Sequence, residues 1–139
     1  MERTMIHVET LRTLLRYEAE TGKLFWLPRT PDMFADTGRG GSAGAAARWN
    51  AVHAGKEAFT AATDSSYRVG AIFDRMYRAH RVIWAMQSGI WPEEVDHING
   101  DRKDNRIVNL RAVSRAVNSR NQRIRSTNKS GHMGVSWSE

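Results

Sequence analysis

Hydrophobic residues at helical spacing predict two helices in this chain. Three leucines recur on one face of residues 10–17. Apolar side chains also form one face of residues 80–88, and Gly89 follows at the position where glycine commonly ends a helix. The two apolar faces consist of Leu11, Leu14 and Leu15 in the first helix and of Val82, Ile83 and Met86, with Trp84 beside them, in the second.

Short apolar or alternating runs predict strands elsewhere. Residues 24–27 form one apolar run. Residues 67–77 alternate in the manner of two strands, and we expect Asp74-Arg75 to form the turn between them. Residues 29–47 are rich in glycine and other small residues, which predicts a flexible loop or linker.

A polar loop between two short runs predicts a β-hairpin in the last third of the chain. The first run ends at Asp96-His97, and the second covers residues 107–113. Ser114 is a suitable N-cap for a helix that follows, so we predict a β–β–α unit. We interpret the polar loop residues as turn formers and not as ligands; they are Asn99, Gly100, Asp101, Asp104 and Asn105.

Composition limits the classes of protein that this chain can represent. Its 139 residues suffice for one compact domain with an appendage, and 40% hydrophobic residues with five Trp allow a modest core. The absence of cysteine excludes disulfides and cysteine-based zinc sites. No apolar run of membrane-spanning length and no signal pattern is present, so we expect a soluble, cytoplasmic protein.

The net charge of +6 is concentrated near the predicted hairpin. Residues 1–100 carry 12 Lys/Arg and 12 Asp/Glu, whereas residues 101–139 carry nine and three. A basic segment of this kind is typical of a surface that binds a nucleic-acid backbone.

The residue types of the hairpin suit phosphodiester hydrolysis, which needs a divalent cation and a base that takes a proton from water. Asp96 offers a hard oxygen ligand suited to Mg²⁺ or Mn²⁺. His97 can act as the base, because an unperturbed imidazole has a pKa of about 6.5. Asn118 could bring a carbonyl oxygen to the same metal. Asn109, across the hairpin from His97, could hold the imidazole through its side chain or its backbone carbonyl.

One geometric condition follows from this assignment. Neighbouring residues on a regular strand point to opposite faces, yet Asp96 and His97 must serve one site. We therefore expect the strand to end or twist at this point, for which Asn99-Gly100 is suitable.

These residues resemble the signature of the HNH nucleases, which are built on the ββα-metal fold. The strings H-R-V-I-W (80–84) and W-P-E-E-V-D-H-I-N-G-D-R-K-D-N-R-I-V-N-L-R (91–111) are similar to those of phage-type HNH homing endonucleases. The resemblance implies that Asp96 and Asn118 bind the metal, that His97 activates water and that Asn109 supports His97. It places His80 at a structural position.

The resemblance also implies the domain organisation. We expect an α+β fold with a ββα-metal (HNH, or His-Me finger) nuclease core over residues 65–125 and a small amino-terminal α/β extension over residues 1–64. Residues 126–139 contain N-K-S-G-x-x-G-V-x-W, which resembles the opening strand of an AP2-like DNA-binding domain. We expect either a shortened form of a longer protein or the loss of that domain.

The sequence thus predicts an endonuclease that hydrolyses double-stranded DNA with one Mg²⁺ or Mn²⁺ ion, by nicking or by double-strand cleavage. We expect a monomer that needs no membrane and no small-molecule cofactor. The expected DNA contacts are Arg106, Arg111, Arg115, Arg120, Arg123, Arg125 and Lys129. A DNA-binding module without cleavage and an RNA nuclease stay open as alternatives. A pure binding module would have no need of the Asp-His-Asn-Asn set.

Overall fold

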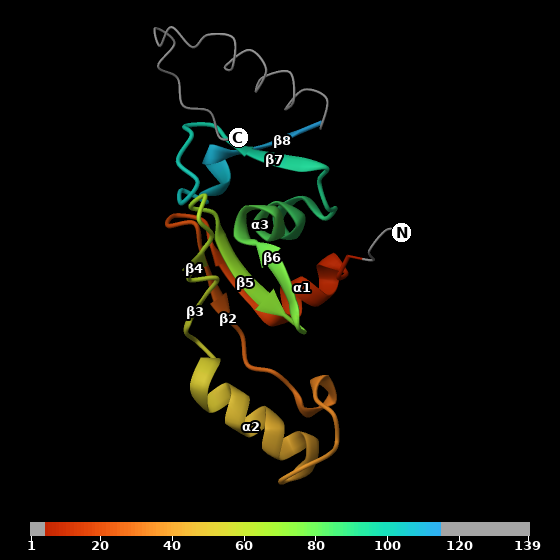
Figure 1. Ribbon diagram of the computed structural model, residues 1–139. Helices are drawn as coiled ribbons and strands as arrows, with labels where there is room; N and C mark the ends of the chain where they lie inside the picture. The colour runs from red at the N-terminus through yellow and green to blue at the C-terminus, as the bar shows by residue number, and fades with distance from the viewer. Residues whose placement is uncertain (1–4, 115–139) are drawn as a thin grey trace, which may run out of the picture.

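The computed structural model describes residues 5–114, and this part of the chain is an α+β fold with antiparallel sheets (Figure 1). The helices are α1 (Val8–Leu14), α2 (Gly41–His53) and α3 (Ala79–Ser88), with short 3-10 turns at Pro31–Met33 and Ile107–Asn109. One sheet joins β1 (Leu15–Glu18), β2 (Lys23–Trp26) and β3 (Glu57–Ala58). A second joins β4 (Ala61–Ala62), β5 (Arg68–Ile72) and β6 (Arg75–Arg78), and a third joins β7 (Glu94–His97) and β8 (Leu110–Val113).

The helix α3 lies at the centre of the hydrophobic core. Its Val82 and Ile83 are completely buried, and Met86 is buried beside them. Gly89 ends the helix in the left-handed conformation, with φ of 91° and its N–H donated to the Ala85 carbonyl. Glycine adopts this conformation without a steric penalty. The predicted helix over residues 80–88 is therefore confirmed.

The first helix is shorter than its leucine pattern predicts. It ends at Leu14, and Leu15 is already extended as the first residue of β1. Leu15 still donates its backbone N–H to the Leu11 carbonyl of the helix, but it already pairs with Trp26 of β2. Leu11, Leu14 and Leu15 are all still buried, because the chain turns from the helix into β1 with the three side chains in the same core.

The segment 29–47 is not a loop throughout, and this part of the prediction was wrong. It contains a 3-10 turn, and α2 begins at Gly41. Alanine has the highest helix propensity of all residue types. The run of alanines after Gly44 therefore outweighs the glycines at the helix start. Figure 1 shows α2 at the end of the molecule that lies away from the β7–β8 hairpin.

The turn between β5 and β6 is centred one residue earlier than predicted. Phe73 and Asp74 both have positive φ, at 50° and 67°, and Arg75 is already the first residue of β6. Two central residues with positive φ match the twist of a tight hairpin.

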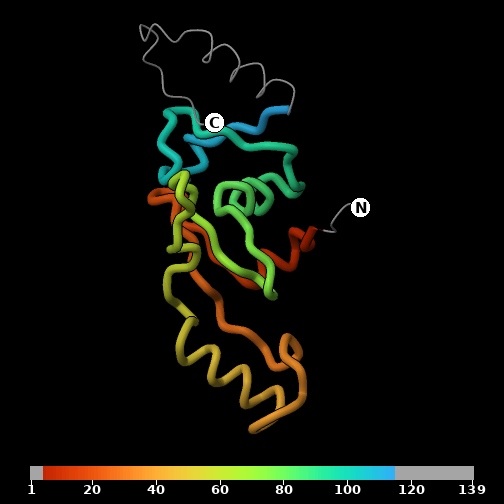
Figure 2. The backbone as a smooth tube through the Cα atoms, viewed as in Figure 1, coloured from red at the N-terminus to blue at the C-terminus, as the bar shows by residue number. Residues whose placement is uncertain are grey.

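The β7–β8 hairpin covers one side of α3 (Figures 1 and 2). The second predicted run is shorter than expected, because Ile107–Asn109 forms a 3-10 turn and β8 begins only at Leu110. The helix predicted after Ser114 lies outside the described residues, as do Asn118 and the segment 126–139.

The predicted boundary between residues 64 and 65 does not separate two packed units. It falls between β4 and β5, which pair in one sheet. Leu11 and Leu24, from before the boundary, share one hydrophobic cluster with Ile72 and Leu110, from after it. The amino-terminal part therefore packs directly against the predicted nuclease part. Within residues 5–114, no helix is long and apolar enough to cross a membrane.

Candidate active site

Asp96 lies near the end of β7, in register with Arg111 of β8. Its Oδ2 accepts a hydrogen bond from the Arg111 Nη2 at 2.6 Å. The carboxylate is almost completely covered, at 5% exposure, whereas the arginine side chain is 45% exposed. The candidate metal ligand is therefore paired with a cation.

His97 is the last residue of β7, and its side chain is completely buried. Its ring centroid lies 4.8 Å from that of His80 on α3 and 6.1 Å from that of Tyr67. The strand ends at His97, as the sequence required, but no hydrogen bond joins its ring to the Asp96 carboxylate among the described residues.

The loop of the hairpin supplies the hydrogen-bond partner of His97. The imidazole Nε2 lies 2.8 Å from the Asn105 Oδ1, and both residues are buried. Because a carbonyl oxygen can only accept, Nε2 carries the proton and donates it to Asn105. Nδ1 is then the basic nitrogen, and it is buried without a hydrogen-bond partner among residues 5–114.

The surroundings of His97 favour its neutral form. Burial lowers the pKa of His97 below its usual value of 6.5, and the positive charge of Arg102 acts in the same direction. The hydrogen bond to Asn105 and the negative charges of Asp96 and Asp101 oppose this shift without cancelling it. A neutral imidazole can accept a proton, so this environment suits a general base.

The His80 ring packs against the His97 ring and is buried, which agrees with the structural position expected for it. Burial lowers the pKa of His80 to about 3, with the charges of His97, Arg78 and Arg81 acting in the same direction. A backbone hydrogen bond with Val95 acts against this shift. His80 is consequently a neutral side chain that packs against the His97 ring.

Asn109 does not make the predicted contact with the His97 imidazole. Its Oδ1 accepts the Asn99 N–H at 3.0 Å, and its Nδ2 donates to the Asn99 Oδ1 and the Asp104 carbonyl, both at 2.9 Å. Its backbone carbonyl accepts the N–H of Ile98. The 3-10 turn places Asn109 just before β8, where its amide faces the loop. Asn109 therefore closes the loop at its base.

The remaining loop residues form turns, as predicted. Asn99 and Asp101 each accept the backbone N–H two residues ahead, and Gly100 has a φ of 79°. Asp104 holds Arg106 through two bonds of 2.7 Å, and this pairing lowers the pKa of Asp104 to about 2.

Asn105 is the exception, since it was predicted to be a turn former and instead contacts His97. Nothing in its residue type distinguished it from its neighbours. Its burial, at 3% exposure, is the property that separates it from them.

The described residues hold only part of the predicted metal and DNA sites. Arg106 and Arg111 are both paired with aspartates. No group of three or more His, Cys, Asp or Glu side chains that could enclose a metal ion occurs within residues 5–114. The donor set is nevertheless suitable for Mg²⁺, which proteins commonly hold through one or two carboxylates while water and phosphate complete the coordination. The other predicted contacts lie outside the described residues: Asn118, Arg115, Arg120, Arg123, Arg125 and Lys129.

The described part of the candidate site is a hairpin that packs on α3 and carries a buried histidine next to a buried aspartate. Residues 77–120 match a family described as HNH endonuclease, and this match includes α3, the whole hairpin and the Asp96-His97 pair. The match to this family is confined to residues 77–120, which are less than half of the chain.

The chain is similar to a solved structure described as "DNA binding and cleavage by the HNH homing endonuclease I-HmuI", with a TM-score of 0.52 and 18% sequence identity. The similarity covers 88% of this chain and 59% of that chain, so this chain spans somewhat over half of the other protein's length. No curated protein matches this chain.

Proposed function

We propose that this protein is a DNA endonuclease that hydrolyses phosphodiester bonds with one divalent cation, and that His97 is its general base. The observation that carries this proposal is the neutral, buried His97 with a free Nδ1, one residue from a carboxylate, in the hairpin of an HNH domain. The description of the similar structure, which names DNA binding and cleavage, supports the choice of DNA as substrate.

In this mechanism His97 takes a proton from the attacking water. The Nδ1 lone pair is the acceptor, because Nε2 is occupied by its bond to Asn105. The ring is completely covered in this structure, so a movement of the ring or of the loop precedes contact with water. Catalytic contacts often form only in the complex with substrate.

Asp96 and Asn118 would hold the divalent cation, Mg²⁺ or Mn²⁺, which stabilises negative charge on the leaving oxygen when it is bound. Arg111 must release Asp96 before that oxygen is available. Once released, the exposed guanidinium is free to contact a DNA phosphate. We propose the same positioning role for Arg106 and for the basic residues beyond position 114, and a monomer as the active species.

Cleavage of supercoiled plasmid with and without Mg²⁺ or Mn²⁺ tests this proposal. We expect the wild-type protein to nick or linearise the plasmid only with a divalent cation, and His97→Gln to be inactive while it still binds the plasmid. An inert wild type that binds DNA with every divalent metal would favour the binding module. Preferential cleavage of RNA in a parallel assay would favour the RNA nuclease.

A further inference from the structure

We propose that Asn105 is the positioning residue for His97, and that the β1–β2 hairpin holds Asn105 in place. The catalytic consequence of this proposal rests on the proposed role of His97 as the base. Its structural part does not, because the orientation and tautomer of the His97 ring can be measured without any cleavage.

The contact between Asn105 and His97 is a buried hydrogen bond of 2.8 Å. Breaking it would leave two polar groups unsatisfied away from water, which makes the paired arrangement strongly preferred. The bond fixes the plane of the ring and the nitrogen that carries the proton. Asn105 therefore determines that Nδ1 is the proton acceptor, although it touches neither water nor DNA in the proposed reaction.

The β1–β2 hairpin contacts Asn105 from the opposite side. The Tyr17 hydroxyl, from β1, donates to the Asn105 backbone carbonyl at 2.7 Å, across 88 residues of sequence. At the hairpin turn, a Cβ atom on Gly22 would lie 2.6 Å from both the Arg106 nitrogen and the Asn105 carbonyl carbon. Only glycine permits this approach, so the turn and the loop are in direct backbone contact.

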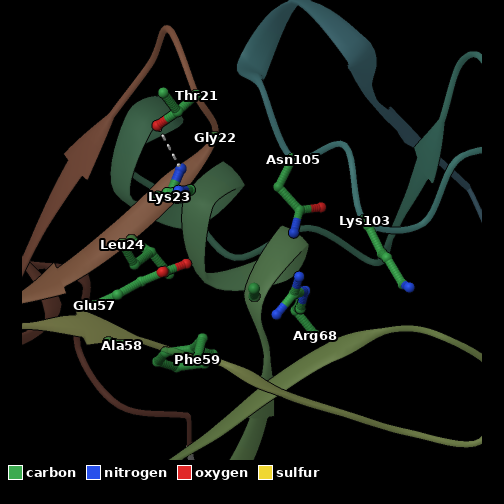
Figure 3. Close-up of a pocket in the computed structure, with 11 residues that line it drawn as sticks. Thr21, Gly22, Lys23, Leu24, Glu57, Ala58, Phe59, Arg68, Lys103 and Asn105 are labelled. Carbon is green, nitrogen blue, oxygen red and sulfur yellow. Dashed lines mark hydrogen bonds between the residues drawn. The ribbon is translucent and has the colours of Figure 1, made fainter.

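Beside this contact, a small cavity lies between the hairpin and the loop. It has a volume of about 70 Å³, and Thr21 and Gly22 line it on one side while Asn105 and Lys103 line it on the other (Figure 3). The loop is therefore not packed continuously against the strands. The contacts that join it to the β1–β2 hairpin are the Tyr17 hydroxyl bond and the close approach at Gly22.

The first test is the tautomer of His97, read from the ¹⁵N chemical shifts of its ring nitrogens and assigned with His97→Gln. We expect the Nε2–H form in the wild type and in Asn105→Asp, which retains an acceptor oxygen. Asn105→Ala should give a mixture of tautomers. Asn50→Ala is the matched control, because Asn50 fastens another loop through two bonds to the Arg29 backbone. An unchanged His97 signal in Asn105→Ala would overturn the proposal.

The second test separates kcat from KM in plasmid cleavage. Removing an outer partner of a functional histidine typically costs about 10- to 100-fold, and we expect Asn105→Ala to lose this in kcat with little change in KM. Asn105→Asp should recover most of the loss. Equal losses in Asn105→Ala and Asn50→Ala would refute a positioning role. A wild type without activity, but with the expected tautomer change, would instead refute only the proposed function.

The third test concerns the hairpin and also covers the case in which Asn105→Ala fails to fold. Gly22→Ala and Gly38→Ala both place alanine at positive φ, but only the first would clash, since nothing lies within 4 Å of Gly38. We expect Gly22→Ala to shift the His97 ring signals and lower kcat about tenfold. Tyr17→Phe should do the same to a smaller extent. Equal effects of Gly22→Ala and Gly38→Ala, or an unperturbed His97 in Tyr17→Phe, would contradict the role of the hairpin.

Discussion

The Arg111 guanidinium and the Asp96 carboxylate face each other across the β7–β8 hairpin, with 2.6 Å between Nη2 and Oδ2. The cation occupies an oxygen that the proposed mechanism assigns to a metal ion. In the proposed mechanism, the arginine and the metal ion would compete for Asp96 in the absence of DNA. DNA phosphates would provide an alternative partner for Arg111, which would couple metal binding to substrate binding.

This competition predicts that removal of Arg111 strengthens metal binding without DNA. A partly exposed ion pair contributes about 1 kcal/mol, so we expect Arg111→Gln to bind Mn²⁺ about fivefold more tightly than the wild type. Titration of Mn²⁺ followed by electron paramagnetic resonance measures this change. Asp96→Asn is the control, and it should weaken binding in both backgrounds. Weaker Mn²⁺ binding by Arg111→Gln would show that the pair does not compete with the metal.

Replacement of His97 should separate catalysis from binding. Removing a positioned base typically costs about 10²- to 10⁴-fold in rate, so we expect His97→Ala to lose nearly all plasmid cleavage while its DNA affinity changes little. The ring is completely buried against His80, so this variant should also lose roughly 1 to 3 kcal/mol of unfolding free energy. Urea denaturation measures that loss, and assays below the unfolding transition remove its influence. Near wild-type cleavage by His97→Ala would exclude it as the base.

Much of the fold could be predicted because the signals were local. The apolar face of α3 and the glycine that ends it lie within a few residues of each other, and so do Asp96 and His97. The helix α2 was missed because the glycines before its alanine run indicate a loop as strongly as the alanines indicate a helix.

The contacts within the site could not be predicted in the same way. Asn105 has the residue type of a turn former, and only the packing of a distant hairpin against its loop buries it. The pairing of Asp96 with Arg111 depends on the register of two strands, which the sequence does not specify residue by residue. Side-chain partners that arise from tertiary packing therefore required the structure.

The pairing of Arg106 with Asp104 predicts how one carboxylate limits DNA binding. Asp104 accepts two bonds from the Arg106 guanidinium and neutralises it. We expect Asp104→Asn to bind DNA more tightly, because Arg106 can then make one additional phosphate contact. The slope of log Kobs against log[salt] should become steeper by about 0.9, the value for one contact with duplex DNA. Fluorescence anisotropy at several salt concentrations provides the measurement. Asp36→Asn, which changes the net charge equally but lies beside the start of α2, should leave the slope unchanged. Equal slopes for the two variants would contradict a local role.

The lowered pKa of His97 predicts the pH dependence of cleavage. In the proposed mechanism the active form is the neutral imidazole, so the rate should fall as the pH decreases through the pKa of His97 in the folded protein. Because burial lowers that pKa, the fall should occur below pH 6.5. Single-turnover plasmid cleavage between pH 5 and 8 would locate it. A rate that still rises strongly above pH 7 would indicate a base with a higher pKa than His97 has here.

His80 should make the folded protein sensitive to acid. Its pKa is about 3 in the folded protein, whereas an unfolded histidine has a pKa of about 6.5. As the pH falls, the unfolded chain therefore binds the proton first. The contribution of neutral His80 to the stability of the folded protein is complete above pH 6.5 and is lost progressively as the pH falls toward 3. At about 1.4 kcal/mol per pKa unit, we expect a loss of roughly 2 kcal/mol between pH 7 and pH 5, measured by urea denaturation. His80→Phe keeps an aromatic ring against Tyr67 but does not titrate, so it should lose less over the same range. The loss that remains in this variant belongs to His97, whose pKa is also lowered by burial. Since Asp104 has its effect only below its usual pKa of 3.8, it does not contribute in this interval. An equal loss in the wild type and in His80→Phe would mean that another group causes the acid sensitivity.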